Sequence, residues 1–465
     1  MSDKKIHHRK KKKSKKVIWI LLAEFLILAT IFGGYRFYIY LQDRQERGTV
    51  DSEDDLSGLT KEQREAREEQ ERLRREEADR QELVKQADQL AFGYDYEAAV
   101  DLLKSYTGSE GSYQVYTSLV KAIERLEEEK ASLSLYGGVY RSVFEISHLY
   151  FGALIADTSR AFDGDGDAVG YNKYNITVAE FEKLLQILYD QDYILVNISD
   201  IYTLETREDG SVSYVPNKFY LQKGKKPIIL CEENVSYFDY MQNDGFASRL
   251  ILEEDGKLTN EMLLSNGTTS TGSFDIVPIV DAFVEKHPDF SYRGAKGLLT
   301  LTGYKGIFGY RTEDTASESY PEEAEAARKV AEALRESGWE FACHSWGYKD
   351  MNSSGVQLLK SDTGRWLEEV GSIVGPTEIY VFPFGNDIEA GGGIYSGEKY
   401  KFLKESGFNV FLGVYKEPWL HIKTKYVRMT RRPVDGQALL EYPDRLADLF
   451  DAKDIIDPLR PARNW

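Results

Sequence analysis

The sequence predicts an α/β protein whose main domain is a closed or nearly closed barrel of parallel strands, preceded by a membrane anchor and a helical region. Seven apolar, strand-like runs alternate with amphipathic helices between residues 136 and 465. Continuous apolar strands separated by helices are typical of parallel sheets buried on both faces. The chain has 465 residues, 42% of them hydrophobic, which is enough for more than one domain and too much for a disordered protein.

The formal net charge of −18 is divided unevenly along the chain. Residues 1–16 carry nine Lys or Arg and one Asp, so the rest of the chain is strongly acidic. Because phosphate binding needs a basic face, this argues against nucleic acid as the partner. Only two cysteines occur, Cys231 and Cys343, which excludes a Cys-rich zinc site and leaves at most one disulfide.

The basic tail, residues 1–16, leads into an apolar run at 17–35 and an aromatic cluster up to residue 40. About 20 apolar residues span a bilayer, and no small-residue cleavage site follows the run. We therefore expect residues 17–41 to form a retained signal anchor, a single pass through the cell membrane. The positive-inside rule places the N-terminus in the cytoplasm and the C-terminal domain outside the cell.

Residues 42–86 are expected to form a charged helical stalk. Glu, Arg, Gln and Lys dominate this stretch, with many opposite charges spaced i,i+4 and hardly any apolar stripe. Such a helix is solvated on all sides and serves as a spacer, whereas a coiled coil would need sustained apolar a and d positions.

Residues 87–135 predict a helical hairpin, two amphipathic helices joined around Gly108 and Gly111. The spacing A-x-G-Y-x-Y-x-x-A-x-x-L-L resembles one unit of a tetratricopeptide-type repeat. A single unit relies on stacking to bury its face. We therefore expect it to pack on the following domain or to bind a protein partner.

The barrel domain, residues 136–465, is built from strand and helix candidates in alternation. The strand candidates are residues 142–155, 193–199, 227–233, 296–303, 339–345, 379–385 and 408–414. The helix candidates are 177–190, 275–287, 321–338 and 356–370, and in the first of them Thr177 and Glu180 are placed as a capping box. Unusual polar residues follow the third, fifth and sixth strands, at the face where β/α barrels carry their sites.

These three strand ends carry runs that resemble a known family. They read P-I-I-L-C-E-E-N (227–234), F-A-C-H-S-W-G-Y (341–348) and Y-V-F-P-F-G (380–385). In this order and spacing they resemble the leading motifs of the polysaccharide deacetylases, carbohydrate esterases that remove acetyl groups from chitin-like and peptidoglycan polymers. The likeness is to a divergent, membrane-anchored Gram-positive type, covers residues 140–455 or so, and implies a distorted (β/α)7-type barrel.

The resemblance implies a site for metal-assisted hydrolysis, in which a carboxylate base works beside a cation held by one aspartate and two histidines. Carried over by position, the base falls on Glu233 and the metal ligands fall on Asn234, His344 and Tyr348. Two of the three ligands are thereby replaced. Amide oxygen is a weak neutral ligand and tyrosine binds metal well only as phenolate, so we expect no tightly bound cofactor. A divalent metal such as Zn²⁺ remains possible if the ligand set is rearranged.

The third motif is altered as well. The arginine that orients the base in the family aligns with Val381, while Pro383, Phe384 and Gly385 keep the loop whose backbone N–H, at Phe384, faces the oxyanion.

Further candidates lie near the expected cleft. Trp346, Tyr237 and Pro383 are candidates for sugar contacts, with packing roles as the alternative. Arg431 and Arg432 follow the last strand candidate and are expected either to contact anions in the cleft or to pair with the surplus carboxylates.

Three functions remain open from the sequence. The first is an extracytoplasmic pseudoenzyme that binds N-acetylated cell-envelope glycan, chitin-like or peptidoglycan, through the old cleft. The second is an active deacetylase with a rearranged metal site, or one that uses Glu233 with the oxyanion loop alone. The third is an envelope assembly protein that acts through its hairpin and stalk.

Overall fold

The computed structural model describes residues 60–137, 143–389 and 393–465. The expected tail, the anchor at 17–41 and the first part of the stalk lie outside these ranges. Within them, no helix is both long and apolar enough to cross a membrane. The chain divides into two compact units, residues 1–77 and 78–465.

The charged stretch forms one long helix, α2 (Lys61–Phe92). Opposite charges pair along it, as in Lys61–Glu65 and Arg72–Glu76. Its first turns are exposed and its buried residues, Ala87 and Ala91, lie near its C-terminal end. The helix therefore runs without a break through position 86, where the sequence suggested that the stalk ends.

The hairpin consists of α3 (Tyr96–Lys104) and α4 (Thr117–Ser132), as expected. Asp95 caps α3 by accepting the N–H of Ala98. The two helices are joined by the short strands β1 (Thr107–Gly108) and β2 (Gly111–Ser112) and a 3-10 turn, η2 (Tyr113–Val115). Leu103, Leu119 and Leu126 form the buried centre of this module. After it, β3 (Ser134–Leu135) pairs with β8 (Tyr220–Leu221).

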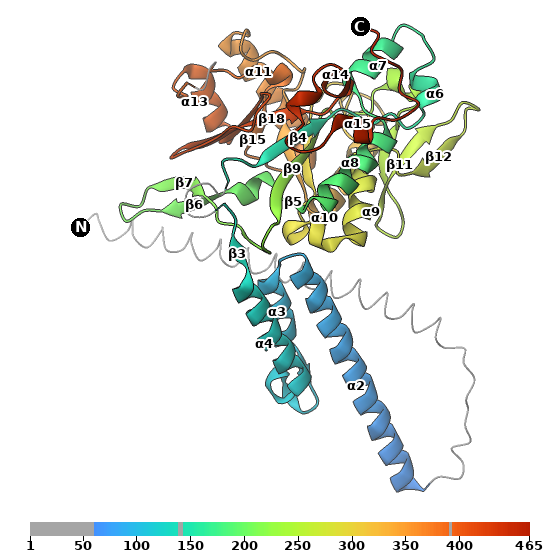
Figure 1. The fold of residues 1–465 in the computed structure, drawn as a ribbon, viewed down its shortest axis with the longest axis vertical. Helices are drawn as coiled ribbons and strands as arrows, with labels where there is room; N and C mark the ends of the chain where they lie inside the picture. The colour runs from blue at the N-terminus through green and yellow to red at the C-terminus, as the bar shows by residue number, and fades with distance from the viewer. Residues whose placement is uncertain (1–59, 138–142, 390–392) are drawn as a thin grey trace. The chain divides into compact units, whose positions relative to one another are not determined.

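The main domain is a closed barrel of seven parallel strands with helices around it (Figure 1). The strands are β4 (Ser147–Phe151), β9 (Lys226–Glu232), β13 (Gly297–Leu301), β14 (Trp339–Cys343), β15 (Ile379–Val381), β16 (Val410–Val414) and β18 (Tyr426–Pro433). They pair in the order β13, β14, β15, β16, β18, β4, β9, and β9 pairs again with β13, which closes the ring. The predicted (β/α)7-type barrel is confirmed.

The identity of one barrel strand differs from the sequence prediction. The candidate at 193–199 forms β5 (Tyr193–Leu195), which pairs with β9, bridges to Ser291 through Leu195 and stays outside the ring. The seventh barrel strand is β18, which carries Arg428, Arg431 and Arg432. All three arginines are buried and bonded to acidic partners. In the sequence they make this run look unlike a buried strand, but in the fold their charges are compensated.

Helices cover the outside of the ring. They are α6 (Thr158–Ala161), α7 (Ala168–Tyr174), α8 (Val178–Asp190), α9 (Ile276–Lys286), α10 (Tyr320–Ser337), α11 (Val356–Trp366), α12 (Ser372–Val374), α13 (Glu398–Glu405), α14 (Gly436–Leu440) and α15 (Ala452–Ile455). The capping box predicted at Thr177 and Glu180 is present at the start of α8.

Smaller sheets decorate the barrel. β6 (Tyr202–Thr206) pairs with β7 (Val212–Pro216), and β17 (Leu420–Lys423) pairs antiparallel with β18. β10 (Arg249–Leu252), β11 (Leu258–Leu263) and β12 (Thr269–Gly272) form a three-stranded sheet.

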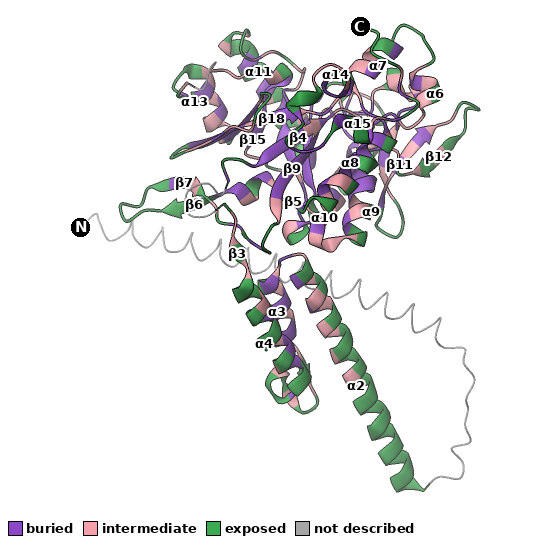
Figure 2. Ribbon diagram, viewed as in Figure 1, coloured by how far each residue is buried: buried purple, intermediate pink, exposed green. Residues whose placement is uncertain are grey.

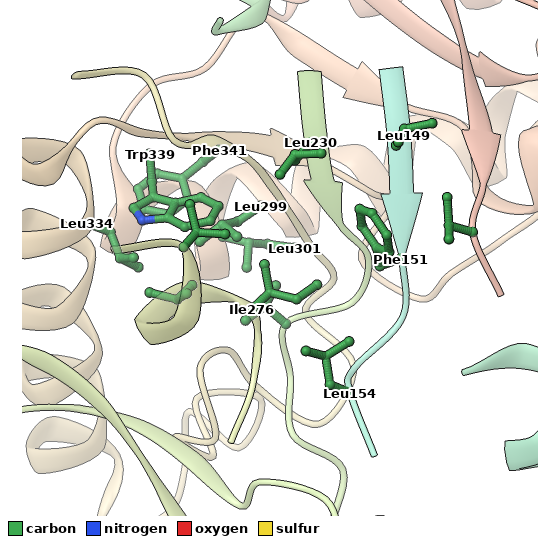
Figure 3. Packing of buried hydrophobic residues seen from close by; sticks show 14 of the residues in the cluster. Leu149, Phe151, Leu154, Leu230, Ile276, Leu299, Leu301, Leu334, Trp339 and Phe341 are labelled. Atoms are coloured by element: carbon green, nitrogen blue, oxygen red, sulfur yellow. The ribbon is translucent and has the colours of Figure 1, made fainter. Parts of the chain in front are cut away.

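Successive side chains along each barrel strand alternate between a core outside the ring, under the helices, and a core inside it, as the two-residue period of a strand requires. Leu149, Leu230 and Leu299 point outward and pack with Ile276 of α9 and Leu334 of α10 (Figure 3). Ile229, Cys231 and Leu298 belong to the separate interior cluster. Figure 2 shows both as the buried centre of the domain. Residues that follow β9, β14 and β18 in the inward register therefore reach the mouth of the barrel.

Candidate functional site

A cavity of about 580 Å³ lies at the C-terminal ends of the strands. Glu233, Asn234, Tyr348 and Phe384 all line it, so the ends of β9, β14 and β15 do meet there. Much of the remaining lining is aromatic, with contributions from Tyr150, Tyr171, Tyr174, Phe238, Tyr240 and Phe246. Pockets of this volume are typical of small-ligand sites.

Glu233, at the expected base position, is fixed on both its backbone and its side chain. Its backbone N–H donates to Phe151 O at 2.8 Å, which continues the β4–β9 pairing past the strand end. Its carboxylate Oε1 accepts Arg431 Nη2 at 2.6 Å and lies 3.6 Å from His344 Nε2. The carboxylate is thus oriented by an arginine and faces an imidazole.

Arg431 lies inside the barrel, fully buried on β18. Nη1 donates to Cys231 Sγ at 3.5 Å, and the guanidinium lies 4.6 Å from the Tyr150 ring centroid. The sequence left two roles open for Arg431, an anion contact in the cleft or a pair with a carboxylate. Arg431 is absent from the described cavity lining and pairs with Glu233, which is the second role. An arginine therefore reaches the base position from β18, although Val381 stands at the family's arginine position.

The two-residue period of β18 could have predicted that Arg431 points into the barrel. Val427 and Met429 are buried in the interior cluster, and the two-residue period continues to Arg431. Sequence reading missed it because three arginines argued against a buried strand.

His344 is fully buried and has a defined tautomer. Nδ1 lies 2.9 Å from the carbonyl oxygen of Val381, which can only accept, so Nδ1 carries the proton. Nε2 is buried without a hydrogen-bond partner. Burial lowers the pKa of His344 to about 4 against the opposing effect of the Glu233 charge. The imidazole is therefore neutral, with its free lone pair on Nε2.

Tyr348 occupies the centre of the altered site. Its ring packs edge-on against His344, with centroids 5.0 Å apart, and against Phe384 at 4.7 Å. Asn234 and Phe384, the expected oxyanion residue, line the same cavity. Burial and the charge of Glu233 raise the pKa of Tyr348 to about 12, so the group is a neutral phenol.

The backbone around the site is strained. Asn234, Ser345, Tyr348 and Phe384 all have φ between 51° and 62°, a region that non-glycine residues seldom adopt. Such residues cluster where a fold holds side chains for function. The strain is therefore retained at all three motif ends although two ligand types have changed.

The residues at the ligand positions do not fit a tightly held zinc ion. They offer a neutral imidazole, an amide oxygen and a protonated phenol, whereas zinc sites use Cys, His and carboxylate ligands. The guanidinium of Arg431 adds positive charge beside Glu233. Asn234 Oδ1 and His344 Nε2 are buried without partners, which suits a water molecule as well as a weak ion. We derive no metal-dependent step from this donor set.

The other predicted site residues are placed as follows. Tyr237 lines the cavity, and its hydroxyl accepts Asn260 Nδ2 at 3.2 Å. Trp346, Pro383 and Arg432 do not belong to the described lining. The indole of Trp346 donates to Glu369 at 2.7 Å, and Arg432 pairs with Asp448. Trp346 and Arg432 are thus held by partners outside the cavity.

Glu232 and both cysteines have structural surroundings. Glu232 is buried, and burial together with Asp275 raises its pKa well above the usual range. The surroundings of Glu232 therefore favour the neutral form of its carboxyl group. Cys231 and Cys343 are free, buried thiols.

Sequence reading missed two carboxylates of the lining, Asp167 and Asp435. Asp435 directly follows β18 and caps α14, so recognition of that strand would have placed it at the mouth. Asp167 stands in the run D-G-D-G-D (163–167) and lies within 4.8 Å of Asp165 and Asp244 through carboxylate oxygens.

Comparison with known proteins gives matches in fold. No family model and no curated protein matches the chain. The Streptococcus pyogenes deacetylase PplD in complex with acetate is similar with a TM-score of 0.36 and 10% identity, over 66% of this chain and 97% of its own. A polysaccharide deacetylase from Bacillus cereus is similar with a TM-score of 0.33 and 12% identity, and the match covers 67% of this chain and 69% of the Bacillus chain.

A CE4 family pseudoenzyme from Bacillus anthracis gives a TM-score of 0.20 and 9% identity, over 37% of this chain and 54% of its own. The closed seven-stranded barrel is the fold which the resemblance of the three motifs implies.

Proposed function

We propose that this chain is a membrane-anchored, extracytoplasmic pseudoenzyme that binds an N-acetylated cell-envelope glycan, chitin-like or peptidoglycan, at the mouth of its barrel. Metal-dependent deacetylation is lost or very weak. The apolar run at 17–41 behind a basic tail supports the anchor and its orientation.

The observation that carries the loss of activity is the position of Tyr348. Its ring packs edge-on against the buried His344 and against Phe384 of the expected oxyanion loop. Burial raises the pKa of Tyr348 to about 12, so a neutral phenol, a poor metal ligand, stands at an expected ligand position.

The cavity supports glycan binding. Sugar rings have apolar faces that stack on aromatic side chains, and their hydroxyls need polar partners at the edges. Tyr240 and Phe384 are each 60% exposed at the cavity, and Phe238 stacks on Tyr240 with ring centroids 5.3 Å apart. These exposed rings offer surfaces for sugars without any rearrangement of the core.

The test is equilibrium binding of tetra-N-acetylchitotetraose and of peptidoglycan fragments to the full chain in detergent, together with an assay for released acetate. We expect saturable binding, no acetate, and at least tenfold weaker binding by Tyr240→Ala. Tyr220→Ala is the matched control, since Tyr220 is 50% exposed and does not line the cavity. Absence of binding to every glycan would refute the proposal.

An active hydrolase is the second candidate, and one observation favours it. Arg431 fixes Glu233 beside the neutral His344, which is an arrangement that suits a general base. Acetate release that disappears in Glu233→Gln and persists in a variant outside the cavity would establish this function in place of the first.

A further inference from the structure

The charge of the cavity points to a particular kind of sugar. Three carboxylates line it from separate elements: Asp167 before α7, Glu233 after β9 and Asp435 before α14. None of the described lining residues is Lys, Arg or His. The lining is therefore anionic and aromatic, a combination that attracts cations.

The three carboxylates differ in how far their charge is compensated. Glu233 is bonded to Arg431, which lies behind it in the barrel. Asp435 forms no ion pair within the described chain, and its Oδ1 accepts the N–H of Ala438 at 2.7 Å. The neighbouring cation Arg460 is already bonded to Glu180 at 2.6 Å. Burial accordingly raises the pKa of Asp435 to about 6, which leaves a carboxylate that is charged at neutral pH and poorly compensated.

The rim adds further negative charge. Asp167 stands within 4.8 Å of Asp165 and Asp244, and Tyr171 of the lining donates to Asp244 at 2.7 Å. Arg160 lies close by but bonds the backbone carbonyls of Gln242 and Asn243, not the carboxylates. The rim cluster extends the negative field of the cavity outward.

We propose that the cavity prefers amino sugars whose nitrogen is a free, protonated amine over N-acetylated sugars in the same polymer. This rests on the proposed function, that the site binds an envelope glycan. An ammonium group has three donors and no acceptor, so it matches a wall of carboxylates and phenols. A neutral acetamido group would displace water from Asp435 and leave its charge without a counterion.

Tyr150 marks where the ammonium group would be held. Tyr150 lines the cavity together with Glu233 and Asp435, and its strand β4 pairs with β18 at Pro433, two residues before Asp435. One face of the Tyr150 ring carries Arg431, whose charge Glu233 neutralises. The Asp435 side is the one without a cation, and there an ammonium would gain the most.

The experiment compares the tetramers of glucosamine and of N-acetylglucosamine, titrated separately into the full chain in detergent at pH 6.5 and low salt. We expect the glucosamine tetramer to bind at least tenfold more tightly. Asp435→Asn should abolish most of that preference, because the glucosamine tetramer loses the carboxylate that attracts its ammonium group and the acetylated tetramer no longer has to desolvate that charge. Asn is an N-cap as good as Asp, so α14 keeps its start.

Asp209→Asn is the matched control, because it removes the same charge from the β6–β7 turn, outside the described lining. It should leave the preference unchanged. Equal affinities, or tighter binding of the acetylated tetramer, would overturn this inference while the proposed function stands. Failure of both tetramers and of peptidoglycan fragments to bind would overturn both.

Discussion

Two buried arginine–glutamate pairs lie at different places in this molecule and are satisfied to different degrees. Near the C-terminus, Arg460 bonds both oxygens of Glu180 at 2.6 Å and also bonds Asn172 and the carbonyl of Asn175. Glu180 in turn accepts the N–H groups of Thr177 and Asp457. Every donor and acceptor of this pair has a partner.

At the barrel mouth, Arg431 bonds Glu233 through one nitrogen and a weak acceptor, Cys231 Sγ, through another. Its Nε is buried without a partner. Close by, His344 Nε2 and Asn234 Oδ1 are also unpartnered. Fully satisfied networks are typical of structural cores, whereas unmet polar groups gather at functional sites. The pair Arg460–Glu180, called the tail pair below, therefore has the surroundings of a structural core, and the pair Arg431–Glu233, the mouth pair, has those of a candidate site.

The largest expected effect comes from breaking the tail pair. Arg460→Met leaves Glu180 charged and fully buried, so we expect the free energy of unfolding to fall by about 3–5 kcal/mol. Urea denaturation of the purified chain measures it. Arg463→Met, which removes an exposed partner of Glu441, is the control and should cost about 0.5 kcal/mol or less. Equal losses in the two variants would refute the structural role of the tail pair.

Next in size is the restoration of a metal site at the mouth. Asn234→Asp with Tyr348→His supplies the two missing ligands beside His344, and both new residues tolerate the positive φ at these positions. We expect Zn²⁺ to bind at least 100-fold more tightly than to the parent, a gain of about 2.7 kcal/mol. Calorimetric titration with zinc measures it. If the double variant binds zinc no better than the parent or the single variants, the positional assignment of the ligands is wrong.

A smaller effect is expected from breaking the mouth pair. Arg431→Met leaves Glu233 beside a cavity, with 15% of its side chain exposed, so water can take over part of the lost bond. We expect a loss of about 1–2 kcal/mol, less than for Arg460→Met. The same urea titration compares the two. A loss as large as that of Arg460→Met would erase the distinction between the pairs.

The smallest expected effect concerns His148, buried in the barrel with both ring nitrogens unpartnered. Burial and the Arg431 charge lower its pKa well below the usual 6.5, so the folded state binds fewer protons than the unfolded one. Stability from this group is present above pH 6.5 and is lost as the pH falls below it. The difference in free energy of unfolding between His148→Leu and the parent should therefore shift by about 1 kcal/mol in favour of the variant between pH 8 and pH 6. A constant difference across this range would show that the pKa of His148 is the same in the folded and unfolded states.

Much of the barrel could be read from the sequence, because period and composition are local properties. Six of the seven ring strands and the capping box of α8 appear as patterns within a few residues. β5 was assigned to the ring because an apolar run shows that a strand is buried but not which neighbours it pairs with. β18 was missed for the opposite reason, since its three arginines look exposed until their partners are known.

For the candidate site, the sequence by itself determined which residue types stand at the motif ends, and thereby the expectation that two metal ligands are replaced. Only the tertiary structure decided what those residues do. Glu233 and Arg431 are 198 positions apart, and Asp435 joins the lining through the same strand. Side-chain periodicity is encoded locally, whereas a salt bridge inside a barrel depends on the order and register in which distant strands pair. That register makes Arg431, for which the sequence left two roles open, the buried partner of Glu233.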